Sequence, residues 1–105
     1  MYLVNYLSLQ TAQQLFISVA RFRTEQALVG PLNGSNTTFQ TPSQEKFVHN
    51  LPFLTIQIYY NGLRLTLLDD YTVAESGGAG TGFDTILVSL PPVSPDHLIA
   101  DYVIA

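Results

Sequence analysis

Apolar and polar residues alternate most regularly in the middle of the chain. The segment LTIQIY at 54–59 alternates apolar with polar residues, a period of two that is typical of a half-buried strand. Its inward-facing residues are expected to be Leu54, Ile56 and Ile58. Asn61 and Gly62 separate this segment from an apolar run at 63–67, and an Asn-Gly pair in that position is a strong signal for a tight hairpin. The pattern therefore predicts two antiparallel strands joined by an Asn61-Gly62 turn.

Five further short segments lie between turn residues and are expected to be strands. They are 25–29, 37–41, 71–73, 85–90 and 97–104. Phe39 is predicted to point inward between Thr38 and Gln40, and the last segment places Leu98, Ala100, Tyr102 and Ile104 on one face. Seven short strands with no helical pattern between them predict a mainly β protein, a small immunoglobulin-like antiparallel β-sandwich.

Turn residues and loops separate these strands. Asn33 and Gly34 tolerate a positive φ and are expected to form a turn, while Asp70 is expected to accept hydrogen bonds from turn amides. The polar segment 42–52 is expected to cover one end of the sheet. Segment 76–82 contains four glycines in seven residues and predicts a flexible hairpin tip.

The first part of the chain has a different pattern. It contains no Gly or Pro, and Thr11 and Gln14 fit a capping box at the start of a helix. Apolar residues recur at spacings of three and four from Leu9 onward, which predicts an amphipathic helix over about 8–20. A strand over 17–23 is the competing interpretation, since Ile and Val favour sheets. We expect a helical docking arm at 1–24 followed by the β-sandwich domain at 25–105.

The composition suggests that partners cover this protein. Only 11% of the 105 residues are charged, whereas about 25% is usual for a soluble domain. A domain of this size leaves many residues at its surface, so apolar side chains are expected there, and such surfaces are usually buried in an assembly. The residues expected to dock the arm onto a neighbouring subunit are Tyr2, Leu3, Tyr6, Leu7, Leu15 and Phe16. The alternative is a helix packed on its own sandwich.

Charge and residue types exclude several functions. The net charge is −4 with only four scattered cations, which disfavours nucleic-acid binding and anionic membrane surfaces. No apolar run approaches the roughly 20 residues of a membrane span, the signal-peptide pattern is missing, and we expect synthesis in a cytoplasm. Asp96 and His97 are adjacent, so a strand places them on opposite faces, and His49 lies in the polar loop. We expect no catalytic, metal-binding or cofactor-binding residues.

Five short motifs occur in an order that resembles a known module. They are NGSNTTF at 33–39, YYNGLRL at 59–65, DYT at 70–72, LPP at 90–92 and DHLIADY at 96–102. The order resembles a β-sandwich module of tailed-bacteriophage virion structural proteins, found in neck, collar, tail-fibre and decoration proteins. The sequence departs from that module at Leu67-Leu68-Asp69, where the module usually has Pro-Gly. The two leucines are expected to be exposed for a contact.

The resemblance implies a function in assembly. It implies a non-enzymatic virion protein, made in the cytoplasm of the host bacterium, that forms a homo-oligomeric ring or collar in the neck or tail attachment region. Its partners would be portal, connector or tail subunits, contacted through the N-terminal arm and one sandwich face. The alternatives are a tail-fibre or host-receptor-binding module and a capsid decoration protein.

Overall fold

The fold was examined in a computed structural model, which describes residues 21–105. The predicted helix at 8–20 and the six arm residues lie outside that range. Seven strands and one 3₁₀ helix follow in chain order. They are β1 (Phe22–Ala27), β2 (Thr38–Gln40), η1 (Pro42–Gln44), β3 (Gln57–Tyr60), β4 (Leu63–Arg64), β5 (Tyr71–Ala74), β6 (Thr85–Val88) and β7 (Leu98–Val103).

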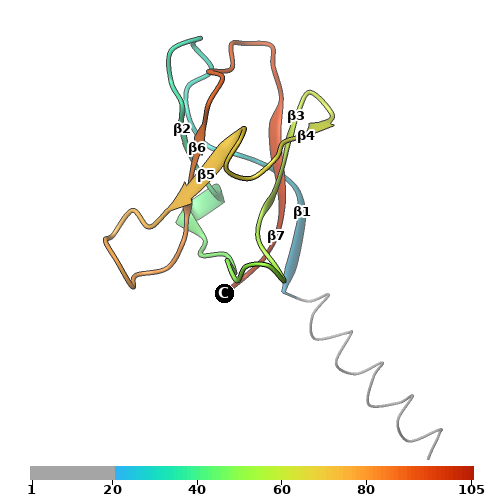
Figure 1. The fold of residues 1–105 in the computed structure, drawn as a ribbon. Coiled ribbons are helices and arrows are strands. Elements are labelled where there is room, and N and C mark those ends of the chain that lie inside the picture. Colours follow the sequence, from blue (N-terminus) through green and yellow to red (C-terminus); the bar gives the residue numbers. More distant parts are fainter. Residues whose placement is uncertain (1–20) are drawn as a thin grey trace, which may run out of the picture.

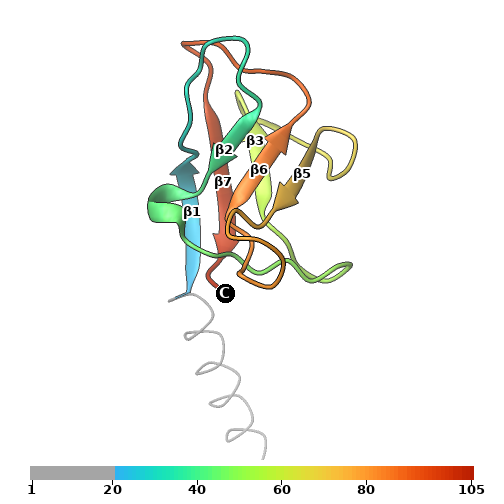
Figure 2. The ribbon, with the colours of Figure 1, turned by 90° about the vertical axis from the view of Figure 1, so that its left-hand side faces the viewer.

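The strands form two antiparallel sheets that pack face to face. The larger sheet has the order β1-β7-β3-β4 and the smaller one the order β2-β6-β5. Figures 1 and 2 show the two layers from directions 90° apart. The prediction of a mainly β protein with seven strands in an antiparallel sandwich is therefore confirmed for the described residues.

The prediction that Leu54 points inward is wrong. Strand β3 begins at Gln57, and the Leu54 side chain is 39% exposed. Its main chain instead pairs with Asn50, with the Asn50 amide 2.6 Å from the Leu54 oxygen and the Leu54 amide 2.8 Å from the Asn50 oxygen. This local closure takes Leu54 out of the strand, whereas Ile56 and Ile58 are fully buried as predicted.

Strand β1 is an edge strand with a bulge. Its pairing with β7 shifts register between Arg23 and Gln26, and Glu25 has a φ of 53°. The Glu25 amide donates to the Asp101 carboxylate at 2.8 Å, which satisfies the group that the bulge removes from the ladder. Bulges interrupt the flat row of donors and acceptors that makes edge strands prone to pairing with other chains. The strand begins at Phe22, three residues before the predicted start.

The core lies between the sheets and extends under the 41–56 segment. Phe39, Ile86, Ala100 and Tyr102 supply buried side chains from β2, β6 and β7. Phe47 comes from the segment after η1, is 1% exposed, and donates its amide to the Phe83 oxygen at 2.9 Å. The loop that was predicted to cover one end of the sheet therefore also contributes a core residue.

The two lateral edges of the sandwich are closed in different ways. On one side Val29 follows β1 and exchanges two main-chain hydrogen bonds of 2.8 and 2.9 Å with Gln40 of β2, which joins the sheets. On the other side β4 and β5 are the outer strands, and within residues 21–105 no strand pairing joins them. The sandwich is therefore open between β4 and β5, and a surface hollow lies there.

The β3–β4 hairpin depends on the Asn61-Gly62 turn. Asn61 has a φ of 49° and Gly62 a φ of 85°, as a type I′ turn requires at both central positions. A Cβ added at Gly62 would meet nothing within 4 Å, so backbone strain alone sets the cost of a side chain. We expect Gly62→Ala to lower the free energy of unfolding by about 1–2 kcal/mol.

Urea denaturation of the full chain would measure that cost. Gly62→Asn is the matched control, because Asn adopts positive φ with less strain than Ala. It is expected to retain more of the stability than Gly62→Ala. Equal losses in the two variants would contradict the strain explanation.

Candidate protein-interaction surface

A hollow of about 310 Å³ opens between the unjoined edges of the two sheets. We call it the leucine pocket. Its lining comes from the β3–β4 hairpin, the turn before β5 and the end of β6, and consists of Tyr60, Leu63, Leu65, Asp70, Val88, Ser89 and Leu90. Because no strand pairing joins β4 to β5, apolar side chains of both sheets reach solvent here.

Exposed leucines surround the pocket. Leu63 is 73% exposed and Leu90 is 75% exposed, values that are costly for side chains of this size. A second hollow of about 220 Å³ lies on the other side of Asp70 and Ser89 and is lined by Leu68 and Leu87 among others. Leu68 is exposed as expected, whereas the expectation that Leu67 is exposed is wrong, because Leu67 packs against the core. The two hollows share Asp70, Val88 and Ser89 in their linings, and exposed leucines lie at both.

Hydrogen bonds hold the turns that shape this surface. The Asp70 carboxylate accepts from the Thr66 amide at 2.7 Å, which fixes the segment between β4 and β5. In the loop between β1 and β2 the Asn33 side-chain oxygen accepts from the amides of Ser35 and Asn36, and Gly34 has a φ of 78°. These predicted turn residues have structural contacts and do not form one site.

Asp96 fixes the position of Tyr60 at the pocket wall. Its carboxylate accepts hydrogen bonds from the Tyr60 hydroxyl, from the Asn61 side-chain amide at 3.0 Å and from the Val93 amide at 2.9 Å. The Tyr60 hydrogen bond is the largest cause that lowers the pKa of Asp96, and it also raises the pKa of Tyr60. The carboxylate therefore anchors the hairpin to the segment before β7 and is not directed at His97.

A second apolar group lies at the other end of β3. Residues 50–54, which we call the Phe53 loop, form a short closed turn through the Asn50–Leu54 main-chain pair. The Phe53 side chain is 84% exposed, and the neighbouring Leu51 is exposed as well. Below the turn, His49 Nδ1 lies 2.7 Å from the Thr55 hydroxyl, and the His49 ring packs edge-on against Phe83. The loop is thus supported at its base and presents an aromatic side chain to solvent.

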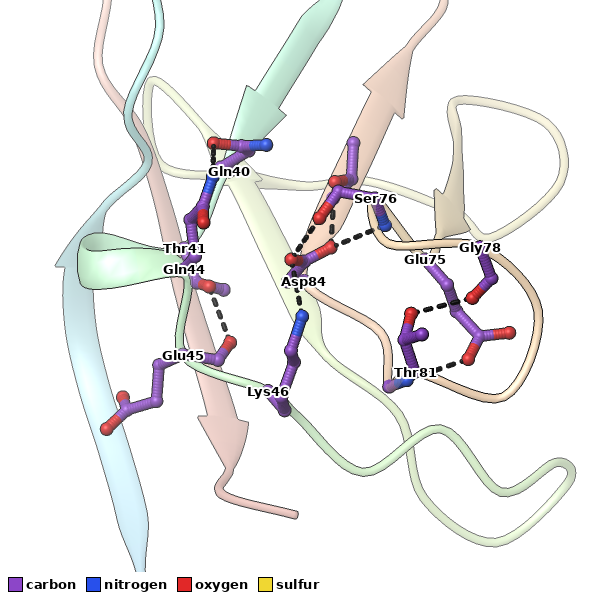
Figure 3. Close-up of polar contacts among 12 residues, drawn as sticks. Gln40, Thr41, Gln44, Glu45, Lys46, Glu75, Ser76, Gly78, Thr81 and Asp84 are labelled. Carbon is purple, nitrogen blue, oxygen red and sulfur yellow. Dashed lines mark hydrogen bonds and ion pairs between the residues drawn. The ribbon is translucent and has the colours of Figure 1, made fainter.

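A buried carboxylate holds the glycine-rich hairpin tip against the core. Asp84 has no exposed surface and accepts from Lys46 Nζ at 2.8 Å, from the Ser76 amide at 2.9 Å and from the Ser76 hydroxyl (Figure 3). Thr85 also donates its hydroxyl to Asp84 at 3.0 Å. Burial alone would raise the pKa of Asp84, but these hydrogen bonds, Lys46 first, outweigh it and hold the pKa well below its usual range.

A catalytic or metal-binding arrangement requires several side chains in contact. His49 has a hydroxyl partner, but within residues 21–105 no carboxylate bonds its ring, so the third group of a catalytic triad is not in place. The same part of the chain holds no cluster of three or more potential metal ligands. Nor does any helix described there have the length and apolar character to cross a membrane.

The pocket and the buried carboxylate were not predicted from the sequence. The pocket combines residues of three separate segments, and only the sheet order brings them together. Asp84 resembles an ordinary turn acid in the sequence, since Lys46 is 38 residues away. The interaction residues that were predicted, at positions 2–16, lie outside the described residues.

Comparisons with protein-family models, with curated protein sequences and with solved structures found no match to the chain.

Proposed function

We propose that this protein is a non-enzymatic structural subunit that works by binding other protein chains in a symmetric assembly. The observation that carries the proposal is the apolar surface around the leucine pocket, where Leu63 and Leu90 are largely exposed. Contiguous exposed apolar surface on a small domain marks an interaction site, because water contact with such side chains is unfavourable. The low charge of the whole chain supports the same function.

The assembly that we propose is a tailed-bacteriophage virion. The support is the resemblance of the five motifs at 33–102, together with a seven-strand sandwich in which those motifs form turns and strands. In this proposal the sandwich is immunoglobulin-like, residues 8–20 form a helix, and the subunit belongs to a ring in the neck or tail attachment region. Portal, connector or tail subunits are its proposed partners. Residues 1–20 carry no charged side chain, which suits an arm buried against a neighbour.

A host-receptor-binding module is the second candidate. One observation favours it, namely the 84% exposure of Phe53 in a loop at the end of the domain, because exposed aromatics often anchor recognition. The glycine-rich tip at 76–82 contains no aromatic residue, so the favoured contact would involve one loop only. Binding of the purified chain to host cells or cell-surface glycans, lost in Phe53→Ser, would support this candidate over the first.

The copy number and position of the chain in the intact particle test the proposal. Antibodies against residues 25–105 are expected to label purified virions at one level of the neck or tail. Quantitative mass spectrometry is expected to give a fixed copy number that matches a ring. Absence of the chain from purified virions would contradict the proposal, and labelling all over the capsid would instead indicate a decoration protein.

A further inference from the structure

The domain carries an apolar hollow at one end and an apolar projection at the other. Strand β3 connects them: the Phe53 loop precedes it, and its last residue, Tyr60, lines the leucine pocket. Figure 1 shows β4 at the upper end of β3 and the light green 50–54 segment at the lower end. The two features therefore lie at opposite ends of β3, so a contact between them joins two copies of the chain.

We propose that the leucine pocket receives the Phe53 loop of a second copy of this chain, so that copies associate head to tail. The inference rests on the assembly function proposed above and names the contact through which the subunits meet. Such a contact uses two different surfaces of the subunit. A subunit bound through its pocket still has a free Phe53 loop for the next copy, so subunits continue to add until a ring closes. This is the geometry that a collar requires.

The sizes and shapes of the two features fit. A cavity of about 150 Å³ is enough to hold a benzene ring. The leucine pocket has about 310 Å³ and leaves additional room for the neighbouring Leu51 side chain. The Phe53 loop is narrow, because the Asn50–Leu54 pair closes it after three residues, and it can enter a hollow between two sheet edges. The order built into the loop lowers the entropy cost of docking.

The charges at the two ends also fit. Asp69 and Asp70 adjoin the pocket, and Asp96 lies behind Tyr60, so acids outnumber Arg64 at that end. The segment from Phe47 to Thr55 carries no Asp, Glu, Lys or Arg, and His49 is its one titratable side chain. Arg21 is exposed at the same end of the domain, where its main-chain oxygen accepts from Ile104 beside the paired Val48 and Val103. The acids near that end have partners within the domain: Glu45 is bonded by Arg23 and Tyr102, and Glu75 accepts from the Gly82 amide. A head-to-tail contact therefore brings the end with the exposed Arg21 toward the acidic end of the next copy.

The area of this contact sets its expected strength. One aromatic anchor buries about 150–250 Å². A stable interface buries at least about 1,200 Å². The isolated contact is therefore expected to be weak and to depend on concentration, and ring closure or other virion subunits would add to it.

The test uses the full chain and two variants, each of which removes one half of the contact. Phe53→Ser removes the projection, and Leu63→Asp places a carboxylate in the pocket wall. Both side chains are mostly exposed, so both variants are expected to keep the wild-type thermal stability. Val29→Ser is the control, because Val29 is 56% exposed on the closed edge beside β2. Sedimentation velocity up to millimolar concentration measures the association.

The wild type and Val29→Ser are expected to associate beyond a dimer as concentration rises, and each of the other variants to associate at least about tenfold more weakly. An equimolar mixture of Phe53→Ser and Leu63→Asp is expected to form a one-to-one dimer and nothing larger, because only one intact pocket and one intact loop remain. If association were weakened in Leu63→Asp but not in Phe53→Ser, the proposal would be overturned, and the pocket would have another occupant. A wild type that stays monomeric, or a mixture that forms no dimer, would overturn it too. Neither result bears on the virion labelling, which tests the assembly function separately.

Discussion

Phe47→Ala is expected to lower the free energy of unfolding by about 3–5 kcal/mol, the usual loss when a fully buried Phe is truncated. The Phe47 ring is 1% exposed, and its centroid lies 6.3 Å from that of Phe83 and 6.2 Å from that of Tyr102. Truncation removes these contacts and leaves a cavity where the 41–56 segment meets β7. Urea or guanidinium denaturation, followed by far-UV circular dichroism, measures the difference.

Phe53→Ala is the matched control for that experiment. It is the same substitution six residues further along the chain, in a side chain that is 84% exposed. Its effect on the free energy of unfolding is expected to stay within about 0.5 kcal/mol, as for most surface substitutions. Similar losses in the two variants would contradict the division of this segment into a buried half and a projecting half.

Asp84→Asn is expected to have the second large effect. It should lower the free energy of unfolding by about 3–5 kcal/mol at neutral pH, as when one partner of a buried charge pair is removed. An NH2 group in place of Oδ2 would direct its hydrogen atoms toward Lys46 Nζ and the Ser76 hydroxyl, which are themselves donors to that oxygen. Lys46→Met is expected to cost less, because the Lys46 side chain is 38% exposed and Ser76 and Thr85 still serve the carboxylate.

The pH dependence of the free energy of unfolding tests whether the charge of Asp84 causes the loss in Asp84→Asn. The pKa of Asp84 is lowered in the folded protein, whereas an unfolded Asp titrates near about 3.9. The carboxylate therefore contributes its full stabilisation above about pH 4, and that contribution is lost as the pH falls from there toward the lowered folded value. The difference between wild type and Asp84→Asn is expected to shrink below pH 4. A difference that stays constant down to pH 2 would point to packing and not to charge.

Local signals accounted for the strands and most of the turns. Alternation at 54–59 and the Asn61-Gly62 pair depend on neighbours in the sequence, and the resulting hairpin is present. Leu54 was assigned to the wrong face because its pairing with Asn50 competes with the strand, and the alternation pattern does not register a turn of that kind. The burial of Phe47 in a polar segment was likewise not foreseen.

The candidate site was less predictable than the fold. The leucine pocket exists because β4 and β5 are outer strands of different sheets, and no single segment of the sequence carries that information. The Lys46–Asp84 pair joins a loop to a strand far along the chain, so neither residue has a partner at a recognisable spacing. Composition predicted that apolar surface would be exposed, but only the sheet order located it.

The two flanks of the sandwich are closed differently, and they are expected to tolerate substitutions differently. The Val29–Gln40 flank is held by main-chain atoms, which every residue except proline supplies, so substitutions there leave the joint intact. On the β4–β5 flank no strand pairing joins the sheets within residues 21–105, and side chains line the opening. Its specificity can therefore diverge residue by residue without disturbing the joint that holds the sheets together. One scaffold can in this way serve rings with different neighbours.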